Sequence, residues 1–269
     1  MQVKRLIQEA TARIASTSQS ARLDAELLLA HTLGVTRVWL HAHPEADVEA
    51  KGFDELVARR VAGEPVEYLT TVASFYGHLF DVTPAVLIPR PETELLVERV
   101  ASLIGSSAVR VVDVGTGSGI IAVTLALLCP NITIRAIDIS SEALEVAKRN
   151  AIRHGVYRRI EFVEADLLSS EKEVQIVVSN PPYIAESYPL PLSVTYEPRL
   201  ALIGGKQGDE LLTRLVIEAR RAGAKVIACE MGYDQRKSMA SLLVKEGADE
   251  VDFYQDYAGF DRGFIAKWL

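Results

Sequence analysis

Val174-Gln-Ile-Val-Val-Ser-Asn180-Pro-Pro-Tyr183 is the stretch that decides most about the fold of this chain. Its run of β-branched apolar residues is typical of a strand buried in a parallel sheet. The strand must end at Pro181 and Pro182, because proline supplies no backbone N–H and holds the residue before it extended. Open α/β sheets bind ligands at the carboxyl ends of their strands. The stretch therefore predicts a rigid rim that offers an amide, carbonyl oxygens and an aromatic ring to a planar –NH2 group.

A second strand, Val109 to Val114, leads into a glycine-rich turn and then into an apolar helix that begins near Ile120. The strand carries Asp113, and the turn reads Gly115-Thr116-Gly117-Ser118-Gly119. The dinucleotide fingerprint would need a glycine at position 120. An acid in front of the turn would repel phosphates but can pair with an ammonium group. We therefore expect a ligand without a pyrophosphate.

Two further strands end in acids. Asp138 ends the run Ile132 to Ile139, about 20 residues past the first glycine of the turn, where an acid can bind ribose hydroxyls. Asp166 ends the run that begins at Ile160 and is followed by apolar Leu167. Because the carboxyl ends of parallel strands share one edge, all four strand ends are expected to border one cleft.

The composition agrees with a buried core and excludes some classes. The 269 residues are 49% hydrophobic, and the net charge of −7 gives no electrostatic footprint for a nucleic-acid backbone. Cys129 and Cys229 have no C-x-x-C spacing and are expected to be reduced core residues of a cytoplasmic protein. No signal peptide or membrane span is predicted. His41 and His43 lack a third ligand nearby, so no metal site is expected.

The chain is expected to have three parts. Residues 1–72 are predicted to form a small helical bundle, in which Ser20 caps a helix from Ala21 to Leu33 that Gly34 ends. Residues 73–90 are predicted to form a β-hairpin linker. Residues 91–269 alternate helix and strand, which indicates an α/β fold with a mainly parallel sheet covered by helices on both faces.

Several motifs together resemble one family. D-V-G-T-G-S-G at 113–119, A-I-D-I-S at 136–140 and V-S-N-P-P-Y-I at 178–184 resemble class I S-adenosylmethionine-dependent methyltransferases that act on amino groups. The remaining motifs resemble the protein-(glutamine-N5) methyltransferases of bacterial peptide chain release factors: G-E-P-V-E-Y-L at 63–69, F-Y-G at 75–77, V-L-I-P-R-P-E-T-E at 86–94, E-P-R-L-A-L at 197–202, E-M-G at 230–232 and G-F-D-R at 259–262. The chain departs from the family pattern at Thr70-Thr71, at Leu167 and at Gln207-Gly208-Asp209.

The resemblance implies a Rossmann-like, seven-stranded sheet whose last strand is antiparallel. It implies S-adenosyl-L-methionine as cofactor, S-adenosyl-L-homocysteine as product, and methyl transfer to the glutamine of the Gly-Gly-Gln motif in class-one release factors. The implied cofactor-binding residues are Asp113, Gly115, Thr116, Gly117, Ser118, Gly119, Asp138, Asp166, Leu167 and Asn180. The implied catalytic residues are Asn180, Pro181 and Tyr183, and the rim Asn180-Pro181-Pro182-Tyr183 is the implied substrate site.

A pocket at one strand end can hold any amide, so we expect residues 1–72 to dock the release factor. We also expect a monomer that binds neither nucleic acid nor membrane. Two alternatives stay open: a nucleic-acid methyltransferase acting on the adenine amino group, which would have to extrude the base, and a non-catalytic cofactor-binding module. Among the other charged residues, Arg90 is expected to shape the cleft or to be structural. Glu197, Glu230 and Asp261 are expected to form salt bridges, and Arg59-Arg60 a solvated helix face.

Overall fold

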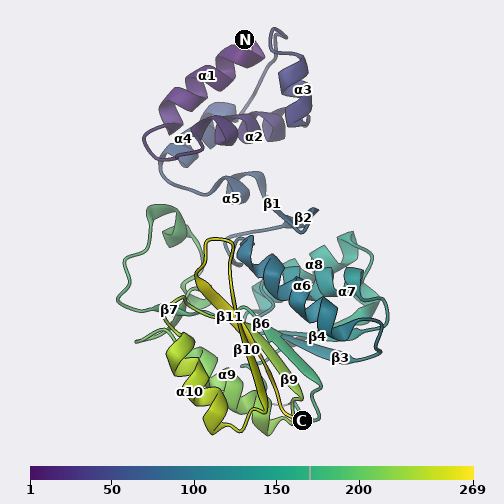
Figure 1. The fold of residues 1–269 in the computed structure, drawn as a ribbon. Helices are drawn as coiled ribbons and strands as arrows, with labels where there is room; N and C mark the ends of the chain where they lie inside the picture. The colour runs from purple at the N-terminus through teal and green to yellow at the C-terminus, as the bar shows by residue number, and fades with distance from the viewer. Residues whose placement is uncertain (170) are drawn as a thin grey trace. The chain divides into compact units, whose positions relative to one another are not determined.

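The computed structural model describes residues 1–169 and 171–269, and these divide into two compact units (Figure 1). One unit comprises Met1–Val72 together with Leu190–Tyr196, and the other comprises Ala73–Pro189 and Glu197–Leu269. The sequence predicted no contribution to the first unit from beyond residue 72. Close packing at Gly63 is one reason why residues 190–196 belong to this unit, since a Cβ at Gly63 would lie 2.6 Å from the side chain of Leu192.

The first unit is a helical bundle. Its helices are α1 (Val3–Ile14), α2 (Ala21–Leu33), α3 (Arg37–Ala42), α4 (Phe53–Val61) and α5 (Val66–Thr70). The predicted end of α2 is confirmed, because Gly34 takes the left-handed conformation that glycine adopts without strain. The predicted cap is wrong: the Ser20 hydroxyl donates to the Asp24 carboxylate and caps no backbone N–H.

The bundle also buries charge. Arg60 is only 9% exposed, and its Nε lies 2.7 Å from a carboxylate oxygen of Asp24, which is also buried. The prediction of a solvated face at Arg59-Arg60 is therefore wrong for Arg60. Arg59 keeps a half-exposed side chain and pairs with Glu64. The burial of Arg60 could not be predicted from hydrophobic periodicity, because it depends on Asp24, which lies 36 residues away in the sequence.

A β-hairpin follows the bundle, and it spans residues 72–81 rather than the whole of the predicted 73–90. Its strands are β1 (Val72–Phe75) and β2 (His78–Asp81). Tyr76 and Gly77 connect them, and both have positive φ, which is the turn geometry that matches the twist of paired strands.

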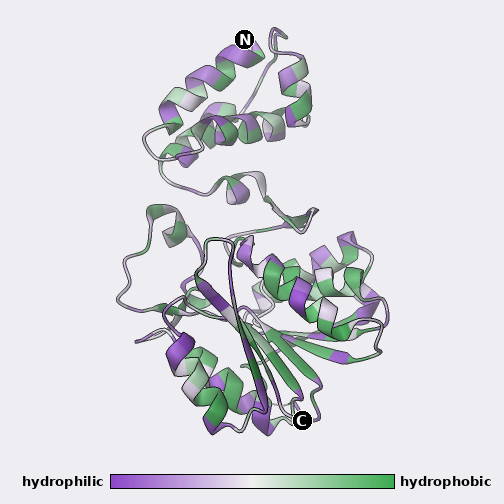
Figure 2. Cartoon of the chain, viewed as in Figure 1, coloured by the Kyte–Doolittle hydropathy of each residue, from purple (hydrophilic) through white to green (hydrophobic). Residues whose placement is uncertain are grey.

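A seven-stranded sheet forms the centre of the second unit. Its strands are β3 (Arg110–Val114), β4 (Thr133–Asp138), β5 (Ile160–Glu164), β6 (Ile176–Ser179), β9 (Val226–Glu230), β10 (Glu250–Gln255) and β11 (Asp261–Lys267). Their order is β10-β11-β9-β6-β3-β4-β5. The expectation for the last strand is confirmed, since β11 runs antiparallel to both β9 and β10. The middle strands are strongly hydrophobic (Figure 2), as burial on both faces requires.

Helices cover both faces of the sheet (Figure 1). On one face lie α6 (Glu92–Ile104), α7 (Ile120–Leu128) and α8 (Ser141–Arg153), which share one hydrophobic core with β3 and β4. On the other lie α9 (Glu210–Arg221) and α10 (Arg236–Lys245), which share a second core. Each parallel strand therefore ends at the same edge, where the connections to the helices begin.

Short elements complete the chain. Three are 3₁₀ turns, η1 (Tyr157–Arg159), η2 (Leu192–Tyr196) and η3 (Arg199–Ala201). The segment after the Asn-Pro-Pro-Tyr rim forms a small parallel pair, β7 (Ile184–Ala185) with β8 (Ile203–Gly205), which the sequence did not predict. Cys129 and Cys229 are buried and free, as expected. Within the described ranges, no helix combines the length and hydropathy that a membrane crossing needs.

Candidate active site

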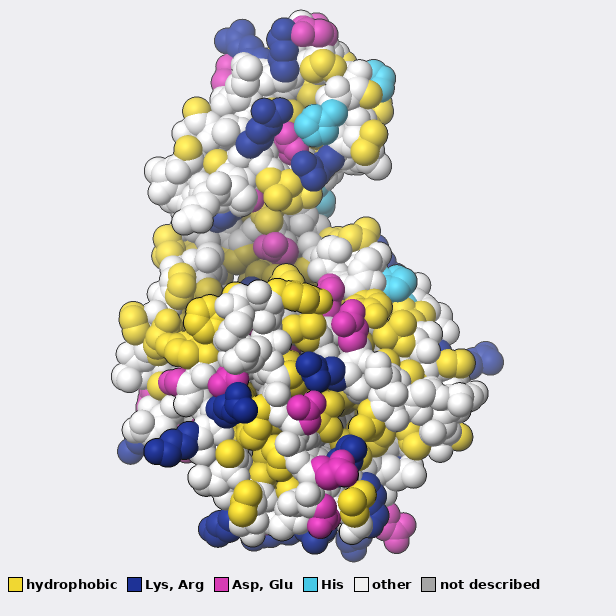
Figure 3. Space-filling model, in the orientation of Figure 1, with side chains coloured by type: hydrophobic (Ala, Val, Ile, Leu, Met, Phe, Trp, Pro, Cys, Tyr) yellow, Lys and Arg dark blue, Asp and Glu magenta, His cyan; other side chains and the backbone are white. Residues whose placement is uncertain are grey.

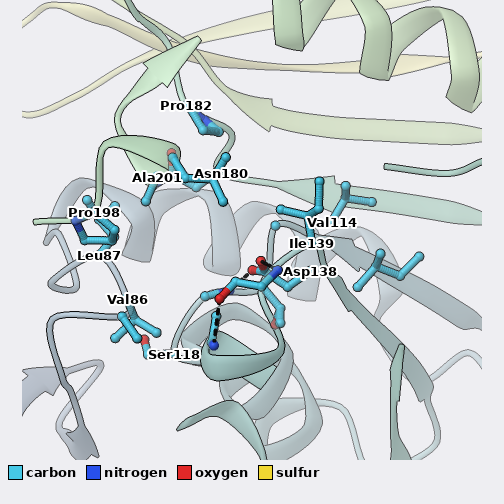
Figure 4. A pocket seen from close by; sticks show the side chains of 18 of the residues that line it. Val86, Leu87, Val114, Ser118, Asp138, Ile139, Asn180, Pro182, Pro198 and Ala201 are labelled. Atoms are coloured by element: carbon cyan, nitrogen blue, oxygen red, sulfur yellow. Dashed lines mark hydrogen bonds between the residues drawn. The ribbon is translucent and has the colours of Figure 1, made fainter. Parts of the chain in front are cut away.

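A cavity of about 530 Å³ lies at the carboxyl ends of β3, β4, β5 and β6, entirely within the second unit. This volume is within the range of small-molecule sites. In Figure 4, Asp138 and Ile139 face Val86, Leu87 and Pro198 across the cavity. The predicted residues that line it are Gly115, Thr116, Gly117, Ser118, Asp138, Asp166, Leu167, Asn180 and Pro182. Residues from the ends of four strands therefore border one cavity.

The glycine turn after β3 depends on positive φ. Gly115 and Gly117 have φ of 68° and 56°, which let the turn fold back while its backbone borders the cavity. Gly119 instead meets a packing requirement, since a Cβ there would lie 3.0 Å from the Cβ of Ala147 on α8. Gly119 is absent from the cavity wall in the described part of the chain, so its role is to let α7 and α8 pack closely.

Asp113 lies beneath the turn rather than in the cavity wall. Its side chain is fully buried, and one oxygen accepts from the Thr116 hydroxyl at 2.6 Å and from the Ala122 N–H at 3.2 Å. Burial raises the pKa of the Asp113 carboxyl to about 7, although both hydrogen bonds lower it. The suggested direct contact with an ammonium group does not fit this placement. Asp113 instead ties the turn to the first residues of α7.

Asp138 lies at the end of β4 and does line the cavity. One oxygen accepts from the Gly117 N–H and the other from the Ser140 N–H, each at 2.9 Å. A carboxylate oxygen can accept two hydrogen bonds, so each oxygen keeps one lone pair for a ligand. Burial raises the pKa of Asp138, while the bonds from Ser140 and Gly117 lower it. The geometry suits a neighbouring pair of hydroxyls.

Asp166 and Leu167 form the next part of the wall, beyond β5. Asp166 pairs with Arg214 at 2.9 Å, and both side chains are half exposed. Leu167 is buried and has φ of 50°, a conformation that strains a residue with a branched side chain. Such strain persists where the surroundings enforce it, often beside a ligand. It places an apolar side chain against the cavity next to the Asp166 carboxylate.

Asn180 points one end of its amide away from the cavity. Its Nδ2 donates to the Thr93 hydroxyl at 3.0 Å, and Thr93 is fully buried in the first turn of α6. Among the described residues, Oδ1 of Asn180 has no hydrogen bond of its own. The site therefore offers an unused acceptor beside the cavity.

The rest of the rim is held from behind. The Tyr183 carbonyl accepts from Nε2 of Gln235, and Gly204 packs against the Pro182 carbonyl so tightly that a Cβ would lie 2.4 Å from it. Pro182 belongs to the cavity wall, whereas in the described chain Pro181 and Tyr183 do not. The small β7–β8 sheet thus fixes the rim.

The charged motif residues have three different environments. Glu197 is buried and pairs with Arg90, and it also accepts from the Ile88 N–H at 3.0 Å. Asp261 pairs with Arg236 at 2.8 Å. Both salt bridges were predicted, and Arg90 itself lines the cavity. The prediction for Glu230 is wrong: its carboxyl is fully buried and has no salt bridge to any described residue.

Sequence reasoning missed several residues of the wall. The apolar ones are Pro84, Val86, Leu87, Ile139, Leu200, Ala201 and Leu211, and the polar ones include Ser140, Glu142 and Arg214. Ile139 carries a sequence signal that could have been used, since it is apolar and directly follows Asp138. In the structure it is 51% exposed. Glu197 holds the segment 84–90 at the cavity through the Ile88 N–H and Arg90.

Solved structures with the same fold support this architecture. The catalytic domain of hMettl16 in complex with the MAT2A 3′UTR hairpin 6 superposes with a TM-score of 0.60 at 16% identity, covering 80% of this chain and 92% of that one. The ribosomal protein L11 methylase of Lactobacillus delbrueckii subsp. bulgaricus gives 0.51 at 20% identity, covering 69% of this chain and 83% of that one. The strand order and these likenesses show that this chain has the fold of the class I methyltransferases.

Comparison with known sequences shows to which family of methyltransferases this chain belongs. Residues 5–70 match the PrmC N-terminal domain, and residues 91–190 match the methyltransferase small domain. The release factor glutamine methyltransferase of Chlorobaculum tepidum is 42% identical over 90% of this chain and 88% of its own length. That of Escherichia coli is 32% identical over 100% of this chain and 99% of its own length. This chain belongs to the release factor glutamine methyltransferase family.

Proposed function

We propose that this chain transfers the methyl group of S-adenosylmethionine to the side-chain amide nitrogen of the glutamine in the Gly-Gly-Gln motif of class-one peptide chain release factors. The observation that carries the proposal is the unused Oδ1 of Asn180 at the cavity, with Nδ2 engaged by Thr93. Such an oxygen accepts a hydrogen bond from an –NH2 group. The relatives' shared name supplies the substrate.

The wall of the cavity fits the cofactor. Asp138 would accept from the ribose hydroxyls with its two free lone pairs. Leu167 and Ile139 would flank the adenine, and Asp166 would accept from its amino group. The turn Gly115–Gly119 would border the methionine part, since glycine backbone permits a close approach. A related fold, the N-terminal domain of human METTL16, was solved in complex with SAH (TM-score 0.53, 17% identity over 71% of this chain and 75% of that one).

The chain's own residues then have to place the amide. S-adenosylmethionine, when bound, supplies a methyl group on a positively charged sulfur that needs little further activation. An amide nitrogen is a weak nucleophile because its lone pair is delocalised into the carbonyl. Asn180 Oδ1 and the Pro181 carbonyl would accept its two N–H groups and hold it in line with the methyl group. The same bonds stabilise the positive charge that develops on nitrogen. Tyr183 would pack on the amide plane, and the proton leaves to water.

Transfer of labelled methyl to purified release factor tests the proposal. Whole release factor should be labelled, and release factor whose Gly-Gly-Gln glutamine is replaced by alanine should not. Equal labelling of both factors, or labelling of duplex DNA instead, would refute it. The adenine alternative has less support: on the face seen in Figure 3, acidic side chains are interspersed with the basic ones.

Selection of one glutamine in one protein requires contact beyond the cavity, and we assign that contact to residues 1–72. Val38 on α3 is 77% exposed, so its side chain is available for contact with a partner. Val38→Asp should lower kcat/KM for whole release factor severalfold, because a desolvated charge weakens an apolar contact. It should leave a short Gly-Gly-Gln peptide unaffected. Val244→Asp, at a valine that is 73% exposed on α10, is the matched control. Equal kinetics for both variants on whole factor would remove Val38 from the docking surface.

A further inference from the structure

Three side chains come from elements that pack against one another at the rim, since both α6 and β6 contact β9. Asn180 follows β6, Thr93 lies in the first turn of α6, and Glu230 ends β9. The register of β6 with β9 pairs Ser179 with Cys229, so Asn180 and Glu230 continue from neighbouring strand ends. Thr93 and Glu230 are both fully buried, and Asn180 Nδ2 donates to Thr93 at 3.0 Å. This places a buried hydroxyl next to a residue that borders the cavity.

Glu230 is unusual because neither carboxyl oxygen has a hydrogen bond of standard geometry to any residue in the described ranges. A buried carboxyl without partners is costly and rare, so it calls for an explanation. Helix α6, which carries Thr93, packs against β9, which ends in Glu230, and the Thr93 hydroxyl lowers the pKa of this carboxyl. Thr93 also accepts the hydrogen bond from Asn180 Nδ2, so it is the group that can link Glu230 to a residue at the cavity.

The hydroxyl of Thr93 can set the orientation of the Asn180 amide. A hydroxyl has a single proton to donate. If that proton is directed to the Glu230 carboxylate, Thr93 presents only lone pairs to Asn180. Nδ2 of Asn180 must then face Thr93, and Oδ1 must face the cavity. The reversed amide would turn its own N–H groups toward the substrate –NH2 group, where donor meets donor.

We infer that Thr93 and Glu230 are positioning residues, which orient the Asn180 amide so that its oxygen receives the substrate; this inference rests on the proposed methylation of an amide. Glu230 acts through Thr93, and Thr93 acts through Asn180.

The protonation state of Glu230 then controls the orientation. An ionised carboxyl only accepts, whereas a protonated one donates to Thr93 and frees the hydroxyl proton for Asn180 Oδ1. Burial raises the pKa of Glu230 to about 7, although the Thr93 hydroxyl and then Arg262 lower it. The charged and titratable groups around the carboxyl are Glu92, Arg90, Tyr183, Cys229, Tyr254 and Arg262. The productive orientation should therefore be favoured above about pH 7 and weakened below it.

Single-turnover methyl transfer at saturating cofactor and release factor tests the inference. Thr93→Val removes the hydroxyl at nearly constant volume and should lower the rate about tenfold or more, while cofactor affinity stays within about twofold. Thr93→Ser restores the hydroxyl and should recover most of the rate. Thr124→Val is the matched control, because Thr124 is also fully buried in a helix and its hydroxyl has no partner in the described ranges.

The pH profile separates positioning from packing. The wild-type rate should rise through about pH 7, and this rise should be absent in Glu230→Gln and in Thr93→Val. Saturating cofactor keeps any titration of Asp113 beneath the glycine turn out of the rate. A Thr93→Val enzyme as fast as wild type, or one that keeps the full pH rise, would overturn the inference.

A measurement without turnover distinguishes this failure from failure of the proposed function. The side-chain NH2 resonances of Asn180, assigned by their loss in Asn180→Ala, should shift through about pH 7 in wild type and stay fixed in Thr93→Val. Fixed resonances in wild type would refute the positioning role even if methyl transfer were normal. Titrating resonances with no transfer to release factor would refute only the function.

Discussion

Replacing Asp138 by alanine should weaken cofactor binding much more than it weakens the fold. In the structure each carboxylate oxygen accepts one backbone N–H, from Gly117 or Ser140, at 2.9 Å. One lone pair per oxygen remains for the ribose. A hydrogen bond to a charged group contributes about 1.5–3 kcal/mol, which raises the dissociation constant about 10- to 150-fold if one such bond is lost. The second ribose bond adds less, because both act on one ligand.

The stability cost should be small for a structural reason. Without the carboxylate, the N–H groups of Gly117 and Ser140 lose their acceptors, which costs about 1 kcal/mol or more each if water does not replace them. The change also removes a carboxylate that burial disfavours, since burial raises the pKa of Asp138. The two effects oppose each other, so the variant should remain folded.

Calorimetric titration with S-adenosylmethionine and with S-adenosylhomocysteine measures the binding, and urea unfolding measures the stability. Glu142→Ala is the control: it removes the same charge from an exposed position on the same cavity wall, in the first turn of α8. Its dissociation constant should stay within about twofold of wild type, well below the loss expected for one charge-assisted bond. A folded Asp138→Ala protein with unchanged affinity, or an equal loss in both variants, would refute the ribose contact.

Three other outcomes are expected. Asn180→Ala should lower kcat about 100-fold while cofactor affinity changes less than about threefold, because the lost bond acts mainly on the transition state; rapid quench and calorimetry measure the two, and a normal kcat would contradict it. The Asp113 carboxyl has a folded pKa of about 7 against 3.8. The folded state therefore holds more protons between these values, so the free energy of unfolding should fall as pH rises from 3.8 to about 7 and level off above that; urea unfolding at pH 5 and pH 8 should show a smaller fall in Asp113→Asn than in wild type. Thr71 has φ of 61° at the end of α5. Thr71→Gly should raise the free energy of unfolding by about 0.5–1 kcal/mol, since relief of left-handed strain exceeds the entropy cost of glycine; a lower melting temperature would contradict it.

The predictions for the strand ends succeeded because they used local physics. A β-branched run followed by Pro181-Pro182 can only be a strand that stops, and positive φ in the turn after β3 requires glycine. The carboxyl ends of parallel strands lie at the same edge of the sheet, so Asp138, Asp166 and Asn180 were expected near one another, and all three line the cavity. The departure at Thr70-Thr71 also became meaningful, because Thr71 occupies a left-handed position where glycine would be unstrained.

Residue pattern alone could not separate the acids from one another. Asp113 and Asp138 each belong to a strand that leads to the cavity, but only Asp138 reaches the cavity wall. Asp113 is turned into the protein, where Thr116 and the start of α7 enclose it. Which side chain at a strand end faces a helix depends on how that helix packs, and the sequence of one strand does not specify that packing.

The sequence by itself determined the fold class, the cavity at the strand ends and the residues of the rim. Hydrophobic period and turn chemistry are properties of neighbouring residues, so they can be read along the chain. The tertiary structure alone decided that Glu230 has no salt bridge to any described residue, that Arg60 is buried against Asp24, and that Thr93 holds the Asn180 amide. Asn180 and Thr93 are 87 positions apart. Contacts at that separation follow from sheet order and helix packing, which only the folded chain brings about.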